Sequence, residues 1–221
     1  MKTASKGIVH VVDDDTALRK ALGWLVESVG LEARLFASAD AFIEAERELA
    51  EPNCLVLDVR LRGMSGLELL EKLQREGNLP PTILITAFAE FSTAVRALKG
   101  GAIDILRKPF ADQDLIDRIW QALELSRASL ERENETGAVR ARFASLSARE
   151  VQVVDLIVAG LSSARIAEQL KLSRRTVEGH RAQIHRKMGA DSLADLVRQV
   201  LTLRGLSRGA SEEKSSGSGR S

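Results

Sequence analysis

Two kinds of hydrophobic pattern divide the chain. Up to about residue 126, short apolar runs typical of strands alternate with longer stretches in which apolar residues recur every three or four positions, as in amphipathic helices. From residue 146 onward only the helical pattern remains. The alternation predicts a parallel sheet with helices on both faces, and the later pattern predicts a small all-helical domain.

Five strand–helix repeats are expected in the first part. The strands are expected at Ile8–Val12, Glu32–Phe36, Cys54–Leu57, Thr82–Ile85 and Ile103–Leu106. The helices are expected at Ala17–Val29, Ala39–Ala50, Gly66–Glu76, Ser92–Lys99 and Asp112–Ser126. The runs CLVLD and TILIT are apolar on both faces, as a buried parallel sheet requires. We therefore predict a doubly wound, five-stranded α/β domain over residues 1–126.

The rest of the chain is expected to form a linker, a helical domain and a tail. Residues 127–145 are highly charged with a single glycine, which predicts a helical linker that ends in a flexible joint. Residues 146–206 predict a helical domain in which Ser173 begins one helix and Gly189 ends it. The serine- and glycine-rich residues 207–221 predict a disordered tail.

Charge is divided unevenly between these parts. Residues 1–126 carry 15 Lys and Arg against 20 Asp and Glu, whereas residues 127–221 carry 17 against 11. This asymmetry indicates a cationic partner for the first part and a polyanionic partner for the second. The sequence has no apolar run near the roughly 20 residues of a membrane-spanning helix, and its single cysteine, Cys54, fits a reducing compartment. We expect a cytoplasmic protein with no membrane partner.

Polar residues follow the ends of four expected strands. These residues are Asp13, Asp14, Asp58, Thr86 and Lys108. Because ligands of open α/β sheets bind at the carboxyl ends of the strands, the five side chains are expected to meet. Several carboxylates together suit Mg²⁺, a lysine suits a phosphoryl group, and one carboxylate could act as a nucleophile. Each residue alone also has a structural explanation, and Asp15 has the position of a helix N-cap.

Residues 8–120 resemble a response-regulator receiver domain. The segments VVDDD, LVLDVRLRGMSGLEL, LITAF and LRKPF match its four signature blocks in order and spacing. The resemblance implies that Asp58 accepts a phosphoryl group from a phosphohistidine of a sensor histidine kinase. It implies that Mg²⁺ is held by Asp13, Asp14, Asp58 and the backbone carbonyl of Arg60, and that Thr86 and Lys108 hold the acyl phosphate. The Lys108–Pro109 bond is cis in this family.

Two residues depart from the family pattern. Ile105 stands where the family usually has an aromatic residue that moves inward together with Thr86, so the pair Thr86 and Ile105 is expected to form an altered switch. Arg62 stands where proline is common in the loop after Asp58, and it places an extra positive charge near the acceptor. The direction of its effect on phosphate lifetime does not follow from the sequence.

The helix after Ser173 is basic and two-sided. Residues 171–187 hold six Lys and Arg against one Glu, Glu178. Its apolar residues Val177, Ile184 and Met188 fall on one line, and the opposite side carries Arg175, Gly179, Ala182 and Arg186. Small residues between arginines allow the helix to approach a groove of DNA closely, while the arginines contact phosphates. A solvated helix face is the simpler alternative.

The helical part resembles a LuxR-type DNA-binding domain of the FixJ/StyR branch of the NarL regulators. The resemblance rests on LSAREVQVVDLIVAGLSSARIAEQL, LSRRTVEGHRAQIHRKM and SLADLV. It implies contacts with double-stranded promoter DNA through Arg174, Arg175, Thr176, Glu178, Gly179, Arg181, Ala182, Gln183, Arg186 and Lys187. Among these, Glu178, Gly179 and Ala182 fall where the family reads bases. The helix from Leu193 to about Leu203 matches the family's dimerisation helix.

Together the resemblances predict a phosphorylation-dependent two-component transcription regulator. We expect a homodimer on phosphorylation, RNA polymerase as a possible further partner, and no enzymatic turnover. Two alternatives stay open: a regulator of this architecture that works without phosphorylation, because of Ile105, and a phosphate sink whose helical domain binds protein. A phosphatase of the haloacid-dehalogenase type is disfavoured, because Ala17 stands where its motif needs Thr or Val.

Overall fold

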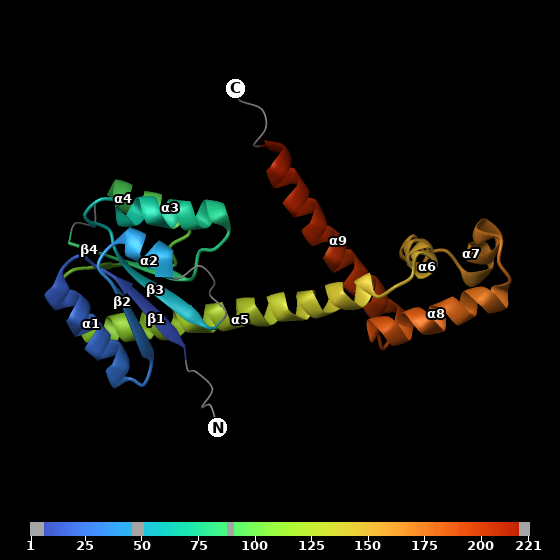
Figure 1. Cartoon of the computed structure of the whole chain (residues 1–221), viewed down its shortest axis with the longest axis horizontal. Helices are drawn as coiled ribbons and strands as arrows, with labels where there is room; N and C mark the ends of the chain where they lie inside the picture. The colour runs from blue at the N-terminus through green and yellow to red at the C-terminus, as the bar shows by residue number, and fades with distance from the viewer. Residues whose placement is uncertain (1–6, 46–50, 88–90, 217–221) are drawn as a thin grey trace. The chain divides into compact units, whose positions relative to one another are not determined.

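The computed structural model describes the backbone of residues 7–45, 51–87 and 91–216 (Figure 1). Side chains are described within these ranges up to Gly205, except those of residues 91–93. The chain separates into two compact units, Met1–Glu131 and Arg132–Ser221. None of the helices in the described ranges combines the length and apolar character that a membrane crossing requires.

The first unit contains a five-stranded parallel sheet in the order β2-β1-β3-β4-β5. The strands are β1 (Ile8–Val12), β2 (Glu32–Phe36), β3 (Asn53–Asp58), β4 (Thr82–Thr86) and β5 (Asp104–Arg107). The first two match the predicted bounds. β3 and β4 extend one residue further at their carboxyl ends, because Asp58 pairs with Ile85 and Thr86 pairs with Arg107. The predicted doubly wound parallel sheet is confirmed.

Five helices connect and follow the strands. They are α1 (Thr16–Ser28), α2 (Ala39–Ala45), α3 (Gly66–Glu76), α4 (Phe91–Lys99) and α5 (Asp112–Ala144). The expected end of α2, residues 46–50, lies outside the described residues. Gly77 ends α3 in the left-handed conformation with φ 72°, as a C-terminal glycine allows.

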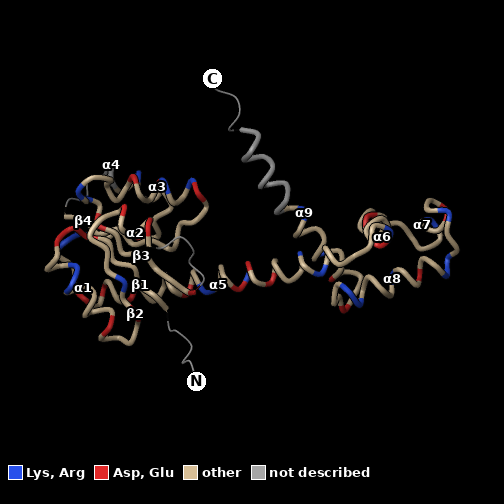
Figure 2. The backbone as a smooth tube through the Cα atoms, in the orientation of Figure 1, with Lys and Arg blue, Asp and Glu red and all other residues tan. Residues whose placement is uncertain are grey.

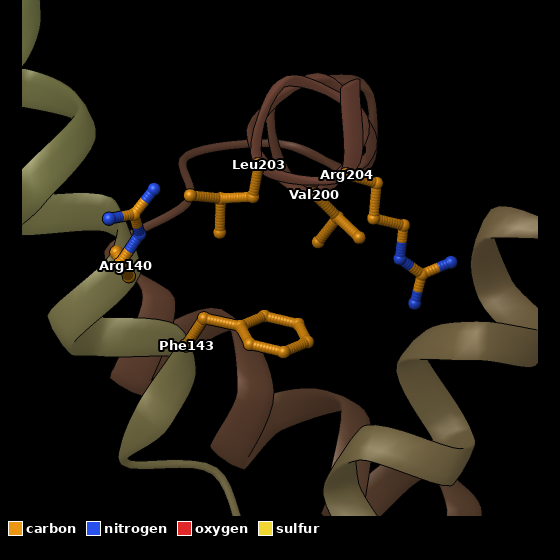
Figure 3. Close-up of a pocket in the computed structure, with 5 residues that line it drawn as sticks. All are labelled: Arg140, Phe143, Val200, Leu203 and Arg204. Carbon is orange, nitrogen blue, oxygen red and sulfur yellow. The ribbon is translucent and has the colours of Figure 1, made fainter. Parts of the chain in front are cut away.

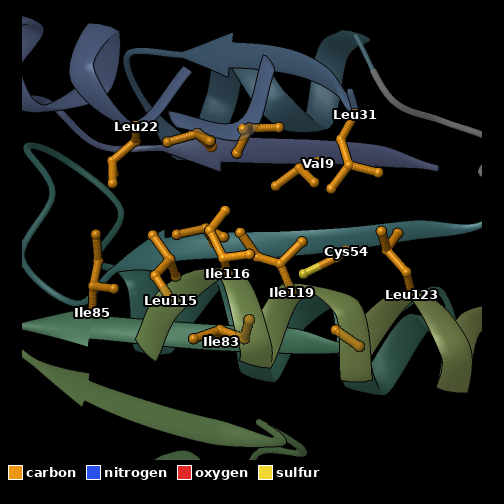
Figure 4. Packing of buried hydrophobic residues seen from close by; sticks show 14 of the residues in the cluster. Val9, Leu22, Leu31, Cys54, Ile83, Ile85, Leu115, Ile116, Ile119 and Leu123 are labelled. Atoms are coloured by element: carbon orange, nitrogen blue, oxygen red, sulfur yellow. The ribbon is translucent and has the colours of Figure 1, made fainter. Parts of the chain in front are cut away.

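Alternate strand residues build two apolar layers, one on each face of the sheet. Val9, Cys54 and Ile83 pack with α1 and α5 on one face, where α5 lays Leu115, Ile119 and Leu123 along the strands (Figure 4). On the other face, Val12, Leu55, Leu57 and Leu84 pack with residues of α2, α3 and α4. Coverage on both faces explains why these strands read as continuous apolar runs. The packing on both faces therefore fixes the positions of the residues at the ends of the strands.

Helix α5 is longer than predicted and takes in most of the expected linker. It runs from Asp112 through Gly137 to Ala144, whereas the sequence predicted a flexible joint before residue 146. One glycine costs a helix only about 1 kcal/mol, and most of its neighbours are good helix formers. Val139 and Phe143 also pack against the apolar core of the second unit. The segment is thus helical up to Ala144, and the packing of Val139 and Phe143 supports the helix at its end, while the flexible joint stays a prediction.

In the described part of the second unit, the regular elements are all helices. It contains α6 (Ala148–Val158), α7 (Ser163–Leu170), α8 (Arg174–Met188) and α9 (Leu193–Ser216), around a buried core that includes Val153, Ile166, Val177, Ile184 and Leu196. The turn between α7 and α8 is three residues long, Lys171 to Ser173. Lys171 takes the left-handed conformation with φ 53°, and the Ser173 hydroxyl accepts a hydrogen bond from Thr176 N. This is the predicted helix-turn-helix arrangement.

The first part of α9 covers the end of α5. Phe143 lies below Val200 and Leu203 across a hollow of about 150 Å³, with Arg140 and Arg204 beside it (Figure 3). The backbone of α9 continues to Ser216. It therefore enters residues 207–216, which the sequence predicted to be disordered. Side chains after Gly205 and residues 217–221 lie outside the description, so disorder of the extreme end stays a prediction.

Candidate functional site

The carboxyl edge of the sheet brings together the predicted acidic and basic residues. Asp13 follows β1, Asp58 ends β3, and Lys108 follows β5. Lys108 Nζ lies 3.0 Å from Asp13 Oδ2 and 3.1 Å from Asp58 Oδ2. Residues separated by as many as 95 positions in the chain thus meet at one point, because parallel strands end at the same edge.

Three carboxylates converge there. One oxygen from each of Asp13, Asp14 and Asp58 lies within 4.8 Å of the others. Asp13 is fully buried and Asp58 is 8% exposed, while Asp14 is half-buried on the solvent side. Lys108 and Arg62 supply two positive charges against the three carboxylates, which leaves excess negative charge, and carboxylate oxygens are hard ligands. The donor set therefore fits Mg²⁺.

The environment of Asp58 opposes its negative charge. Burial raises the pKa of Asp58, and the neighbouring Asp13 carboxylate raises it further, while Lys108 and the backbone N–H of Arg60 lower it. The N–H of Arg60 lies 3.4 Å from Asp58 Oδ1. A cation beside Asp58 would stabilise the charged form of this carboxylate, which burial and Asp13 destabilise.

Asp15 has a different role from its two neighbours. Its side chain is the N-cap of α1 and accepts hydrogen bonds from Ala17 N at 2.8 Å and Leu18 N at 3.2 Å. These backbone bonds lower the pKa of Asp15. The structural interpretation of Asp15 is thereby confirmed, and the acidic run divides into two residues of the carboxylate cluster and one cap.

Thr86 and Lys108 are linked through the backbone. Lys108 N donates to Thr86 O at 2.8 Å, and the Lys108–Pro109 bond is cis. The Thr86 side chain is buried at the end of β4. Ile105 is half-buried in β5, pairs with Leu84 and packs against the apolar layer of α2 to α4. The predicted switch residues thus lie on adjacent strands.

An apolar groove adjoins the carboxylate cluster. It has a volume of about 630 Å³, and its lining includes Leu18, Leu22 and Leu25 of α1 with Pro109 and Phe110 after β5. Asp15 and Lys108 also line it. The groove therefore offers a partner an apolar surface that reaches the charged site.

In the second unit, several basic residues lie along α8, and they are coloured blue on its backbone tube (Figure 2). The exposed predicted residues are Arg174, Arg175, Thr176, Glu178, Gly179, Ala182, Gln183 and Arg186, and Arg181 is half-buried. Nothing lies within 4 Å of the place where a side chain on Gly179 would begin. Arg186 hydrogen-bonds Gln183 on the same face. The buried side, Val177, Ile184 and Met188, faces the core, so the predicted two-sidedness of the helix is confirmed.

Lys187 does not belong to this exposed face. Its Nζ lies 2.6 Å from Glu150 Oε2 and donates to Ser145 O at 3.3 Å. The Glu150 side chain is 6% exposed, also caps α6 by accepting from Ser147 N at 2.7 Å, and has its pKa lowered to about 2, chiefly by Lys187. The contact of Lys187 with DNA stays a prediction; in the structure its ammonium is the partner of a buried carboxylate, which needs such a counter-charge. Sequence spacing gave no sign of this pair, whose members lie 37 residues apart.

Fold and site define a class of protein: a receiver-type α/β unit joined to a helix-turn-helix unit. Residues 9–120 match the family described as "Response regulator receiver domain", and residues 144–200 match "Bacterial regulatory proteins, luxR family". The chain therefore belongs to the response regulators that carry a LuxR-type DNA-binding domain.

Relatives cover almost the whole chain. The transcriptional regulatory protein FixJ of Bradyrhizobium diazoefficiens is 40% identical over 197 residues, which are 89% of this chain and 96% of FixJ. DctR of Rhodobacter capsulatus, a C4-dicarboxylate transport transcriptional regulatory protein, is 46% identical over 194 residues, 87% of this chain and 98% of DctR. The solved structure of the response regulator StyR matches with a TM-score of 0.79 and 39% identity, over 89% of this chain and 99% of that chain. The similarity thus extends across both units of the chain.

Proposed function

We propose that phosphorylation of Asp58 controls the binding of this regulator to promoter DNA. The proposal depends on one observation: at the edge of the sheet, Lys108 Nζ lies within 3.1 Å of a carboxylate oxygen of both Asp58 and Asp13. Asp13, Asp14, Asp58 and the backbone carbonyl of Arg60 would hold Mg²⁺. The bound ion would supply positive charge that screens the oxygens of an incoming phosphoryl group.

The chemistry is a phosphoryl transfer from nitrogen to oxygen. A carboxylate oxygen of Asp58 attacks the phosphorus of a phosphohistidine on a sensor histidine kinase, and the phosphorus–nitrogen bond breaks as the new phosphorus–oxygen bond forms. Lys108 neutralises the acyl phosphate, and the Thr86 hydroxyl donates a hydrogen bond to it. The transfer happens once per Asp58, so we assign no enzymatic turnover to the chain.

The apolar groove beside Lys108 supports a kinase partner. A phosphohistidine must approach Asp58 from solvent, and leucines of α1 with Phe110 offer an apolar surface next to that approach. An amphipathic helix of the kinase fits such a groove.

The second unit supports binding of double-stranded DNA through α8. Arg174, Arg175 and Arg186 are exposed and can reach phosphates, while Glu178, Gly179 and Ala182 lie on the exposed face that would read bases. We propose that a homodimer binds two half-sites. Leu193 and Leu201 of α9 are 47% and 53% exposed, which supports contact with a second copy. Contact with RNA polymerase and a cytoplasmic location stay predictions.

Incubation of the full chain with acetyl phosphate, with and without Mg²⁺, tests the phosphorylation step. Intact mass should rise by one phosphoryl group only when Mg²⁺ is present, and the modified peptide should contain Asp58. A mass gain that chelation of Mg²⁺ does not affect, or that maps elsewhere, would contradict the proposal. The alternative of a regulator that works without phosphorylation is favoured only by the aliphatic Ile105.

A further inference from the structure

Arg62 lies in a loop that is folded back over the carboxylate cluster. Gly66 N donates to Val59 O at 3.0 Å, which closes the loop between β3 and α3. A side chain on Gly66 would begin 2.1 Å from Asp58 O, so only glycine permits this close return. Gly63, with φ 80°, turns the chain directly after Arg62. The loop therefore holds the backbone of Arg62 near the site.

The guanidinium of Arg62 pairs with one carboxylate of the cluster. Arg62 Nε lies 3.2 Å from Asp14 Oδ2. Asp13 and Asp58 are both paired with Lys108 from the inside, so Asp14 is held from the solvent side by a different cation. The Arg62 side chain is 92% exposed, whereas that of Asp14 is 25% exposed. The guanidinium can thus leave Asp14 without disturbing the packing of the unit.

We propose that Arg62 competes with the divalent cation for Asp14 and so weakens the affinity of the site for Mg²⁺. To coordinate the metal, Asp14 must give up its ion pair with Arg62. The loop keeps the displaced guanidinium near the site, where it repels the dication. The inference rests on the proposed function only in taking Asp14 as a ligand of Mg²⁺. Arg62 is in this sense a positioning residue that sets the Mg²⁺ concentration at which the site fills.

The expected size of the effect is modest, and it depends on salt. An exposed ion pair is worth enough to change an equilibrium constant by about two- to fivefold. Ionic strength screens exposed charges, with a Debye length of about 10 Å at 0.1 M and about 3 Å at 1 M. Removal of Arg62 should therefore tighten Mg²⁺ binding at low salt and change it little at high salt.

Isothermal titration of the full chain with MgCl₂ tests this inference directly. Wild type, Arg62→Ala and Arg34→Ala would be compared at low and high NaCl. Arg34→Ala is a matched control, because Arg34 pairs with Glu32, and Glu32 begins β2 at the opposite end of the sheet. We expect the Kd for Mg²⁺ to fall about two- to fivefold in Arg62→Ala at low salt, and to stay unchanged in Arg34→Ala.

Three outcomes would overturn the inference: an unchanged or higher Kd in Arg62→Ala, an equal effect in Arg34→Ala, or a difference that persists undiminished at high salt.

Failure of the proposed function would be seen in different measurements. If wild type gives no Mg²⁺ isotherm, or if Asp14→Asn binds as well as wild type, then the assignment of the metal site itself is wrong. Circular dichroism of each variant would verify that the fold is unchanged.

Discussion

The two units place their charged residues in opposite ways. In the first unit, the carboxylates Asp13 and Asp58 are buried, come from different strands and share the single ammonium of Lys108. In the second unit, Arg174, Arg175 and Arg186 are exposed and come from one helix, α8. A buried site built from distant residues loses its function when one group is removed. An exposed row of cations loses only part of its affinity for a partner with each cation removed. Substitutions should therefore act in an all-or-none manner in the first unit and gradually in the second.

The second unit also contains an exception that sharpens this contrast. Lys187 follows Arg186 directly, yet Lys187 neutralises the buried Glu150 while Arg186 is exposed. Neighbouring cations on one helix thus have different surroundings: Lys187 pairs with a buried carboxylate, and Arg186 is open to solvent and is the one proposed to contact DNA. Burial of the partner, and not position on a basic segment, decides which role a residue has.

The largest expected effect is the loss of phosphorylation in Asp58→Asn. The amide cannot act as the nucleophile, so treatment with acetyl phosphate and Mg²⁺ should add no phosphoryl group, as measured by intact mass. Asp15→Asn is the matched control, because asparagine also caps helices and Asp15 is the N-cap of α1. This control should be phosphorylated like wild type. A phosphorylated Asp58→Asn would remove the assigned role of Asp58.

The next effect is on stability, in Lys187→Met. Loss of the ammonium leaves Glu150 buried without a counter-charge. We expect the free energy of unfolding of the second unit to fall by about 2 kcal/mol, less than the roughly 3–5 kcal/mol for a fully buried pair, because Lys187 is 33% exposed. Arg186→Met should leave stability unchanged. Urea unfolding followed by circular dichroism measures both, and equal stabilities of the two variants would contradict the distinction between Lys187 and Arg186.

The same pair predicts a dependence on pH. Because the pKa of Glu150 is lowered from 4.5 to about 2, its ionised form stabilises the folded unit above pH 4.5, and this contribution is lost as pH falls toward 2. The difference in stability between wild type and Glu150→Gln should therefore be largest above pH 4.5 and shrink below it. Unfolding curves at several pH values would show this, and a difference that grows in acid would contradict it.

A smaller effect is expected when one arginine of α8 is removed. Arg175→Ala should weaken binding to all DNA sequences alike and make the negative slope of log K against log salt shallower by about 0.9, the value for one phosphate contact. For wild type, about six contacts predict a slope near −5. Fluorescence anisotropy at several salt concentrations measures these slopes. Arg75→Ala on α3 should leave the slope unchanged, and an unaltered slope in Arg175→Ala would exclude that residue from the DNA contact.

The smallest effect is a gain of stability in Gly179→Ala. Nothing lies within 4 Å of the added methyl group, and alanine favours the middle of a helix over glycine by about 0.5–1 kcal/mol. Thermal unfolding should therefore shift upward. Gly66→Ala offers the opposite case, because its methyl group would begin 2.1 Å from Asp58 O and should destabilise the first unit. A lower unfolding temperature in Gly179→Ala would show that the glycine has a structural role.

The sequence was sufficient where a local pattern or a topological rule applied. Strands β1 and β2 were predicted to the residue, and the meeting of Asp13, Asp58 and Lys108 followed from the rule that parallel strands end at one edge. The cap formed by Asp15 followed from its position before α1. These features depend on spacing within one element or on the order of strands.

Features that depend on contacts between distant residues were missed. The continuation of α5 to Ala144 depends on packing of Phe143 in the second unit, and the inward role of Lys187 depends on Glu150. The pair of Arg62 with Asp14 depends on how a loop folds back over a strand end. No periodicity in the sequence reports such contacts, because each joins segments whose approach is fixed only by the complete fold.

The most direct test of the central claim compares DNA affinity with and without the phosphoryl group. A DNA fragment selected in vitro with the phosphorylated protein would be titrated by fluorescence anisotropy against wild type and Asp58→Asn, before and after acetyl phosphate with Mg²⁺. We predict that treatment tightens binding of wild type by at least about tenfold, a shift of about 1.4 kcal/mol, and leaves Asp58→Asn unchanged. A wild-type protein that gains the phosphoryl group yet binds the fragment with unaltered affinity would contradict the account.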